Sequence, residues 1–436
     1  MNRGPILIVS AHLPPESHGG ADIYAHWFSE ALSEIDNDVI IYYLSKRQPE
    51  QPPGELRIEK RGRLKLASSS VDWESLDDRE KHFFNLDIHY ALSCLISRYT
   101  PRITHIQGGF RITASAAYAA KKARAKVVIT LHDYFYICPK VNLWMASGAT
   151  CDAITSPRQC MTCLRTRPLA TLETMQDWMG QLPEAPRSQA RLARQLNLNR
   201  STLAMADGLL SPSSRLAEIH KASGVATKIR ISRLGIPRSA QARVPKRRQS
   251  HNLTRIGFIS HLHPHKGAHI LLHAALLLID SIGRYEISIY GSLDKQSRYH
   301  ARLLNLGERA PGVQFRGHYC SEDVTAILSD LDAIVVPSLW EENSPLVVML
   351  ALRCGVPVLA SRIGGIPELV ADGRNGLLFN TGDHTHLART LRRVIENPTI
   401  LTNLARHATY PRTTEDDAHE MLSYYSEIEA GHTRKA

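Results

Sequence analysis

The side chains best suited to chemistry lie in one stretch of forty residues, Trp340 to Phe379. Glu342 places a carboxylate just before Asn343, Ser344 and Pro345, and an apolar run follows. We expect Ser344 to be the N-cap of a helix and Pro345 its first residue, because a proline there loses no intrahelical hydrogen bond. The free N–H groups at such a helix start suit a phosphate, and the carboxylate suits sugar hydroxyls. The segment therefore predicts a site for an anion that carries hydroxyl groups.

The rest of this segment predicts a helix, a strand and a turn. The apolar run 346–354 indicates a helix that ends at Gly355, since glycine is common just past a helix end. The run 356–360 indicates a short buried strand, and Gly364 and Gly365 indicate the next sharp turn. Helix, strand and turn thus follow directly on the carboxylate.

A second candidate for phosphate binding is the loop 260–267, which comes directly after a predicted strand. It contains Lys266 just before a predicted helix, and a lysine there acts as a point charge for a phosphate. The pair Asp330 and Asp332 looks like a metal-binding motif, but it stands where the strand 333–336 begins. We interpret that pair as a loop cap.

Strands and helices alternate along the chain, which predicts an α/β protein with parallel sheets. Helices are expected at 23–32 and 112–123. The pattern gives two Rossmann-like halves of similar size, with the ligand in the cleft between the carboxyl ends of the two sheets. The predicted strands are 5–10, 38–43, 103–107, 126–131 and 208–211, then 256–260, 286–290, 313–316, 333–336 and 356–360.

The domain division follows from composition. A stretch rich in Arg, Lys, Gln and Ser is the best candidate for a linker, and the alternation breaks at 138–200, which holds a cysteine cluster and two polar helical stretches around 172–182 and 188–203. We interpret 138–200 as an insertion at the edge of the first domain, close to the cleft. The expected parts are a first domain (1–237), the linker (238–254), a second domain (255–410) and a C-terminal segment (411–436) with a helix near 414–429.

The overall composition is that of a soluble globular protein with two cores, at 436 residues, 43% hydrophobic and 22% charged. The first apolar run soon reaches Pro14 and Pro15, and no run approaches the roughly 18 apolar residues of a membrane span, so we expect a cytoplasmic protein. The net charge is +11, with a basic cluster at 246–248. Without zinc-finger spacing or an RNA-binding motif, a nucleic-acid partner is not expected. Peripheral contact with an acidic inner membrane face and a plain solvated surface both stay open.

Four of the seven cysteines fall in one window, Cys138, Cys151, Cys160 and Cys163, with the spacing C-x12-C-x8-C-x2-C. In a cytoplasmic enzyme such clustering favours a metal over disulfides. Four thiolates would complete a closed tetrahedral zinc site, so structural zinc is the first interpretation. Buried free thiols and a disulfide remain alternatives.

The segment after Trp340 resembles the donor-binding signature of retaining glycosyltransferases of the GT-B fold, the large family numbered four. The matching residues are Glu342, Asn343-Ser344-Pro345-Leu346, Gly355-Val356-Pro357-Val358 and Gly364-Gly365 with Glu368. The resemblance implies two Rossmann-like domains, with a last helix that crosses back onto the first. It also implies that Glu342 contacts the transferred sugar, with Asn343, Ser344, Pro345 and Leu346 at the donor.

The resemblance extends to further parts of the cleft. Ser260 and His261 stand where the family has Gly-Arg, and Lys266 is implied to hold the donor diphosphate, at the opposite end of the donor from Glu342. Gly19 and Gly20 resemble the loop whose amides approach the transferred sugar. The sequence Thr130-Leu131-His132-Asp133 resembles the family's histidine motif, so His132 is expected to be a sugar ligand, with His105 as a weaker second candidate.

One position departs from the signature. Leu350 stands where the family has a second glutamate, which accepts hydrogen bonds from the nucleotide ribose. A leucine accepts none, so the contact is lost unless Glu341 or Glu368 supplies a carboxylate from another direction. This departure keeps open a catalytically degenerate protein that serves as a binding or regulatory subunit. A sugar-nucleotide epimerase of the same fold is a further alternative.

The resemblance implies a metal-independent reaction that needs no cofactor. A sugar moves from a nucleotide-sugar to a carbohydrate or lipid-linked acceptor with retention, in surface polysaccharide or glycolipid biosynthesis. The leaving phosphate is implied to take the proton of the acceptor hydroxyl, so His132 and Glu342 act mainly by positioning the reactants and stabilising charge.

Overall fold

The first half of the chain builds an eight-stranded sheet in the order β3-β4-β2-β1-β5-β6-β7-β8. Its strands are parallel except β3, which pairs antiparallel with β4 at the sheet edge. The central strands are buried along nearly their whole length and most of their residues are apolar, as expected where helices cover both faces of a parallel sheet. The strands are β1 (Ile6–Val9), β2 (Val39–Leu44), β3 (Arg57–Arg61), β4 (Leu64–Ser69), β5 (Ile103–Gln107), β6 (Lys126–Thr130), β7 (Gly208–Ser211) and β8 (Ile229–Ile231).

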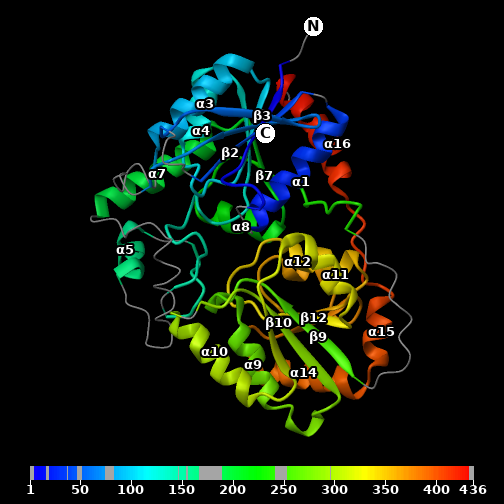
Figure 1. Ribbon diagram of the computed structural model, residues 1–436. Coiled ribbons are helices and arrows are strands. Elements are labelled where there is room, and N and C mark those ends of the chain that lie inside the picture. Colours follow the sequence, from blue (N-terminus) through cyan, green and yellow to red (C-terminus); the bar gives the residue numbers. More distant parts are fainter. Residues whose placement is uncertain are drawn as a thin grey trace.

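The second half builds a separate six-stranded parallel sheet in the order β11-β10-β9-β12-β13-β14. Figure 1 shows the two sheets in two lobes, one above the other. Both sheets are open and parallel, so the predicted α/β class with two Rossmann-like domains is confirmed. The strands are β9 (Thr254–Ile259), β10 (Tyr285–Tyr290), β11 (Val313–Gly317), β12 (Ala333–Val336), β13 (Val358–Ser361) and β14 (Gly376–Phe379).

Helices pack on both sheets and supply the remaining core. Those of the first half are α1 (Gly20–Ile35), α3 (Leu86–Tyr99), α4 (Ser115–Lys122), α5 (Pro157–Arg165), α7 (Gln189–Met205) and α8 (Ser214–Ala222). Those of the second half are η2 (Pro264–Lys266), α9 (Ala268–Leu276), η3 (Ile279–Ser281), α10 (Arg298–Arg309), η4 (Ser321–Asp323), α11 (Val324–Ser329), α12 (Leu346–Arg353), α13 (Ile366–Leu369), α14 (His384–Glu396), α15 (Thr399–Ala405) and α16 (Thr414–Glu429). The computed structural model describes residues 4–15, 19–36, 38–46, 52–73, 83–145, 147–153, 156–165, 189–240, 253–294 and 296–431.

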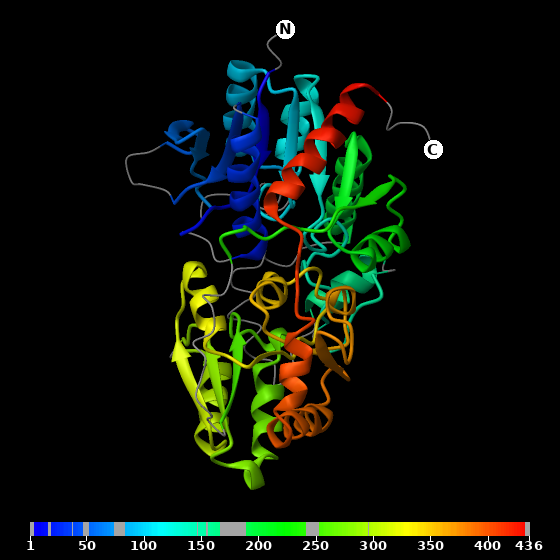
Figure 2. The same cartoon turned by 90° about the vertical axis from the view of Figure 1, so that its right-hand side faces the viewer.

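The last helix, α16, returns to the first domain and lies along it in Figures 1 and 2. It begins with a capping box in which Thr413 and Asp416 exchange hydrogen bonds. Asp417 accepts a hydrogen bond from the hydroxyl of Tyr24 on α1 at 2.9 Å, and the hydroxyl of Tyr425 lies 2.6 Å from Nδ1 of His105 on β5. These contacts join α16 to α1 and β5 of the first domain.

His105 is therefore a structural residue. Its second ring nitrogen lies 2.7 Å from the hydroxyl of Thr130, and the side chain lines neither cavity between the domains. The prediction that His105 binds a sugar is wrong. Its side chain faces α16 and is held there by Tyr425.

The predicted strands are all present, with ends shifted by at most two residues. Among the strands in the described residues, β3, β4, β8 and β14 were not predicted. The second sheet starts at Thr254, inside the range proposed for the linker, and the rest of that range from 241 to 252, with its basic cluster, lies outside the described residues. The helical stretch expected at 172–182 also lies outside them, whereas the one expected at 188–203 is α7.

Candidate functional site

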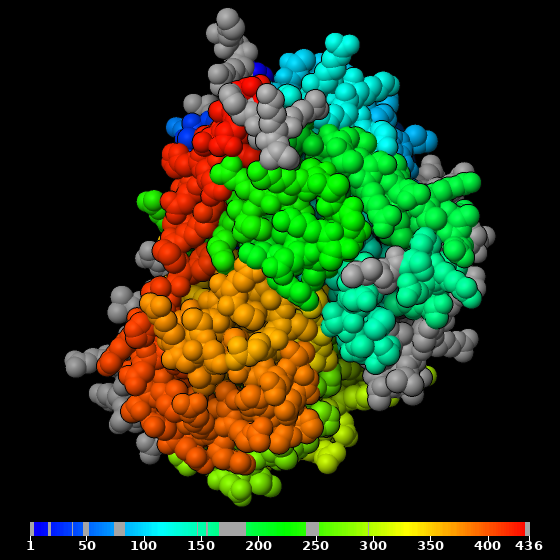
Figure 3. All heavy atoms as spheres, turned by 180° about the vertical axis from the view of Figure 1, so that it is seen from behind, coloured from blue at the N-terminus to red at the C-terminus, as the bar shows by residue number. Residues whose placement is uncertain are grey.

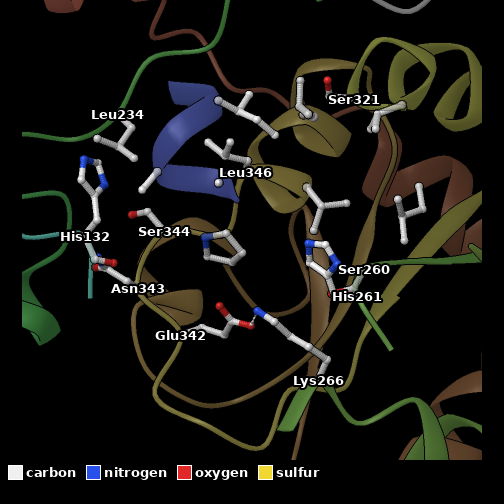
Figure 4. Close-up of a pocket in the computed structure, with 18 of the residues that line it drawn as sticks. His132, Leu234, Ser260, His261, Lys266, Ser321, Glu342, Asn343, Ser344 and Leu346 are labelled. Atoms are coloured by element: carbon white, nitrogen blue, oxygen red, sulfur yellow. Dashed lines mark hydrogen bonds and ion pairs between the residues drawn. The ribbon is translucent and has the colours of Figure 1, made fainter. Parts of the chain in front are cut away.

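Two adjoining cavities lie between the domains, where the strands of both sheets end. The smaller has a volume of about 250 Å³ and the larger about 780 Å³. Gly20, Ala21, His261 and Lys266 line both, so the two spaces meet at those residues. Figure 4 shows the smaller cavity, with side chains from both domains turned toward one space.

Every predicted donor-binding or catalytic residue lines one of these cavities. Gly19 lines the larger one. The smaller one is lined by Gly20, His132, Ser260, His261, Lys266, Glu342, Asn343, Ser344, Pro345, Leu346 and Leu350. Segments that lie far apart in the sequence therefore meet at one place.

A close approach of two backbones positions Lys266. The short helix η2 ends at Gly267, whose φ is 76°, and a Cβ there would lie 1.9 Å from the carbonyl oxygen of Pro337. Only glycine fits such a site. The ammonium of Lys266 lies 4.8 Å from the centroid of the Trp340 ring and 2.7 Å from Oε1 of Glu342. The lysine is thus held over an aromatic face beside a carboxylate.

Glu342 is 4% exposed and accepts hydrogen bonds from Lys266 and from the hydroxyl of Ser338, both at 2.7 Å. The predicted glycine turn fixes this segment, since a Cβ on Gly364 would lie 2.0 Å from the Glu342 carbonyl oxygen, and a Cβ on Gly365 would lie 2.0 Å from that of Asn343. We expected Lys266 and Glu342 to stand at opposite ends of the donor. They instead form a direct ion pair. A buried carboxylate needs a cation or hydrogen-bond donors, which explains the pairing.

The helix α12 starts at Leu346, with Pro345 as its N-cap. The prediction that Ser344 caps this helix is wrong, because its hydroxyl donates a 3.4 Å hydrogen bond to the carbonyl oxygen of Pro212 in the first domain. The amides of Val348 and Met349 bond to the Pro345 carbonyl oxygen. The amides of Leu346 and Val347 open the helix without an intrahelical partner, and both residues line the smaller cavity.

Asn343 links this helix start to the first domain. Its Nδ2 donates to the carbonyl oxygen of His132 at 3.0 Å, and its Oδ1 accepts from the hydroxyl of Ser213 at 2.7 Å. The asparagine is 6% exposed, so both bonds are shielded from water. Asn343 therefore fixes the position of His132 relative to the start of α12 across the domain boundary.

His132 lies at the end of β6 and is neutral. Burial lowers its pKa to about 4. Its Nε2 lies 2.7 Å from Oε1 of Gln107. Because an amide oxygen only accepts, Nε2 carries the proton and Nδ1 is left as a hydrogen-bond acceptor. The next residue, Asp133, lines the larger cavity, and burial raises its pKa to about 6.

Leu350 faces the smaller cavity from α12 and is 6% exposed. Leu346 lies one turn before it and contacts Gly20, where a Cβ would lie 3.6 Å from the leucine. Ile23 and Trp27 of α1 also line this cavity. The wall where the signature has its second carboxylate is therefore apolar, and the contribution of Ile23 and Trp27 to it was not predicted.

Neither alternative carboxylate reaches this wall. Glu341 accepts two hydrogen bonds from the guanidinium of Arg215, at 3.0 and 3.2 Å. Glu368 accepts from the backbone amides of Ser214 and Arg215 at the start of α8, and it pairs with Arg233. Both glutamates serve contacts between the domains. Figure 3 shows second-domain atoms in orange meeting first-domain atoms in green.

Two other groups line neither of these two cavities. Asp332 accepts a 2.7 Å hydrogen bond from the amide of Arg255, which is the loop role that we expected of the aspartate pair. Cys138, Cys151, Cys160 and Cys163 together line a third cavity of about 340 Å³, and none of the four forms a disulfide. Within the described residues, no three His, Cys, Asp or Glu side chains are grouped as a formed metal site. Structural zinc therefore stays a prediction.

None of the helices in the described part of the chain is long and apolar enough to cross a membrane. Across almost its full length the chain has the GT-B fold of known structures. Sucrose-phosphate synthase from Thermosynechococcus elongatus aligns over 98% of this chain and 100% of its own, with a TM-score of 0.71 and 20% identity. HepE from Anabaena, in complex with UDP and glucose, aligns over 98% and 100%, with a TM-score of 0.66 and 17% identity.

Proteins related in sequence match half of this chain or less. The amylovoran biosynthesis glycosyltransferase AmsK of Erwinia amylovora is 28% identical over 228 residues, which are 50% of this chain and 55% of AmsK. A D-inositol 3-phosphate glycosyltransferase of Streptomyces bingchenggensis is 30% identical over 162 residues, 35% of each chain. The chain thus spans about half, or less, of the length of these relatives. Residues 254–397, which form most of the second domain, match the model of the family "Glycosyl transferases group 1".

Proposed function

We propose that this protein is a retaining glycosyltransferase, which moves a sugar from a nucleoside diphosphate sugar to a hydroxyl of a carbohydrate or lipid-linked acceptor. The observation that carries the proposal is the smaller cavity, where Lys266, Glu342, the start of α12 and His132 converge from two domains. A cation and open amides suit a diphosphate, and a carboxylate with a neutral imidazole suits sugar hydroxyls. The group 1 match of the second domain and the role named for AmsK support transfer in polysaccharide or glycolipid assembly.

In this reaction the bond between the anomeric carbon and the phosphate oxygen breaks, and a bond from the acceptor oxygen forms on the same face. The acceptor proton passes to the departing phosphate. Lys266 and the α12 amides stabilise the charge that develops on the diphosphate, so Lys266 must shift from Glu342 toward the phosphate. Glu342 and Nδ1 of His132 then accept hydrogen bonds from the sugar. These roles need no metal ion, and we expect activity to persist in EDTA.

The second candidate is a non-catalytic binding subunit, which the apolar wall at Leu350 favours, since a ribose hydroxyl finds no carboxylate there. Both candidates bind a nucleotide. They differ in turnover, because only the enzyme breaks the bond between sugar and phosphate.

The deciding experiment incubates the protein with a panel of nucleotide-sugars and follows the products by mass spectrometry. Release of nucleoside diphosphate, by transfer or slow hydrolysis, is the expected result, and NMR of the product bond should show the donor's anomeric configuration. An isomerised donor would indicate an epimerase. Calorimetric binding of a nucleoside diphosphate without any turnover would indicate the non-catalytic subunit.

A further inference from the structure

Arg111 is a charged side chain in the larger cavity that the proposed reaction does not use. It follows β5 and lines that cavity but not the smaller one. Its guanidinium carbon lies 5.3 Å from the centroid of the Trp73 ring and 5.6 Å from that of Phe110. Among the described residues the guanidinium has no ion pair and no hydrogen bond. Two aromatic faces therefore hold a cation that has no ion-pair partner in the described part of the chain.

Arg111 is partly buried, which makes this lack of a partner costly. Burial lowers the pKa of Arg111, and Asp22 offsets the effect only through its longer-range charge. The Asp22 carboxylate already accepts hydrogen bonds from the hydroxyl of Ser10 at 3.0 Å and from the amide of His12 at 3.2 Å. The donors of the guanidinium fork thus stay available to a ligand in the cavity.

The backbone holds Arg111 in a conformation that a random loop would avoid. Arg111 has a φ of 63° and Thr113 a φ of 58°, both in the left-handed region that disfavours branched or long side chains. The amide of Thr113 bonds to the carbonyl oxygen of Gly109 at 2.8 Å, and a Cβ on Gly109 would lie 2.4 Å from the Phe135 ring. Non-glycine residues persist in this region where the surrounding structure fixes them, often beside ligands.

We propose that Arg111 binds an oxyanion of the acceptor, so that the acceptor is a sugar or polyol carrying a phosphate or carboxylate group. The inference rests on the proposed function, and it names the acceptor class. A planar guanidinium fork matches both oxyanions with two parallel hydrogen bonds. Asp133, which lines the same cavity, suits the hydroxyls of such a molecule. The first domain supplies Arg111 and Asp133, whereas Lys266 serves the diphosphate of the donor from the second.

Calorimetry with matched pairs of probes tests this without turnover. The pairs are glucose 6-phosphate and glucose, glucuronate and glucose, inositol 1-phosphate and inositol, and glycerol 3-phosphate and glycerol, each with the protein saturated by a nucleoside diphosphate. One bidentate charge-assisted contact should give the anionic member of at least one pair a roughly tenfold or greater advantage in Kd. The phosphate and carboxylate pairs distinguish the two oxyanions.

The variant Arg111→Asn removes the guanidinium, and asparagine tolerates the left-handed backbone. It should abolish the preference for the anionic probe. Arg124→Asn is the matched control, since Arg124 is exposed on α4's end with a φ of 59°, and it should keep the preference. Equal binding of both members of every pair overturns the proposal, as does a loss of nucleoside diphosphate affinity in Arg111→Asn, which would place the arginine on the donor. Absence of turnover with intact anion preference would instead count against the proposed function alone.

Discussion

At the scale of single residues, the ion pair between Lys266 and Glu342 is the centre of the site. Ligand binding has to exchange this contact for contacts to a diphosphate and a sugar. The ion pair therefore holds the two groups next to each other. Ser338 donates a hydrogen bond to Glu342, and the ammonium of Lys266 lies over the ring of Trp340. Buried pairs of this kind lose stability when one member is removed, because the other charge is left alone.

Lys266→Ala should accordingly lower both activity and stability. Loss of a charged hydrogen-bond partner of about 1.5–3 kcal/mol predicts a fall in kcat/KM of roughly tenfold or more, with a lower urea midpoint. Glu342→Ala should act in the same direction. Arg362→Ala is a suitable control, because Arg362 pairs with Asp372 on the exposed surface of the same domain. Normal kcat/KM in folded Lys266→Ala would show that the lysine does not hold the donor.

Leu350 gives the second prediction at this scale. A glutamate there would place an acceptor at the apolar wall, so Leu350→Glu should tighten nucleoside diphosphate binding at least severalfold, by roughly 1 kcal/mol or more. The same change buries a carboxylate at a position that is 6% exposed, so the free protein should be less stable. Calorimetry measures the first effect and thermal unfolding the second.

Leu350→Met separates these effects, since it keeps the size and adds no strong acceptor. It should leave nucleotide affinity near that of the natural protein. Unchanged or weaker binding by Leu350→Glu would mean that the ribose lies elsewhere or that the donor site has been abandoned, and the second case would favour the non-catalytic subunit.

At the scale of elements, the sequence predicted what depends on local pattern. A buried strand such as β12 was located to the residue, because a continuous apolar run marks it. β3 escaped because its five residues are mostly charged and exposed, as suits a sheet edge. The prediction that Ser344 is the N-cap was wrong because its hydroxyl donates a hydrogen bond to the carbonyl oxygen of Pro212, which is distant in sequence. The pairing of Lys266 with Glu342 across 76 positions likewise depends on tertiary packing and has no local signal.

The cysteine segment gives the prediction that belongs to this scale. Burial raises the pKa of Cys138 to about 12, although the backbone amides of Lys140 and Leu143 stabilise its thiolate. A metal ion would have to displace the protons of the four thiols that line one cavity, and this makes affinity strongly dependent on pH. With zinc bound by these four thiolates, elemental analysis of freshly purified protein should find about one zinc per chain.

Cys160→Ser should then lose the zinc and lower the unfolding temperature. Cys94→Ser is the control, because Cys94 is exposed on α3 outside this cavity, and it should keep the metal. Metal-free natural protein with four titratable thiols in this segment would establish buried free cysteines instead.

At the scale of the whole molecule, the two lobes are joined by polar contacts around the cleft and by α16. The stability of such an arrangement depends on the charges of its ionisable groups, and the buried histidines change charge in mildly acidic solution when the chain unfolds. Within the described residues, burial lowers the pKa of His105 and His263 to about 3 and that of His132, His220 and His269 to about 4. These groups remain neutral in the folded protein at a pH where the unfolded chain already binds protons.

Stability should therefore fall as the pH drops below about 6.5, the unfolded value for histidine, toward 4. Two carboxyls, Asp133 and Asp417, oppose this trend, since their folded pKa values of about 6 favour the folded state as pH falls from 6 toward 4. The five histidines outnumber them, so the net direction is destabilisation by acid. Urea midpoints at pH 7.5 and pH 5 measure the fall.

A single substitution makes this argument quantitative. His220 is fully buried, donates from Nδ1 to the Leu216 carbonyl oxygen at 2.9 Å and stacks on Tyr134, far from any role in the cleft. With a folded pKa of about 4, its share of the loss between pH 7.5 and pH 5 is about 2 kcal/mol. His220→Gln should reduce the pH-dependent loss by about that amount, whatever it does to stability at pH 7.5, whereas His407→Gln, at an exposed site, should not change it. An equal loss in all three proteins would mean that acid acts on the carboxyl contacts between the domains, and not through the buried imidazoles.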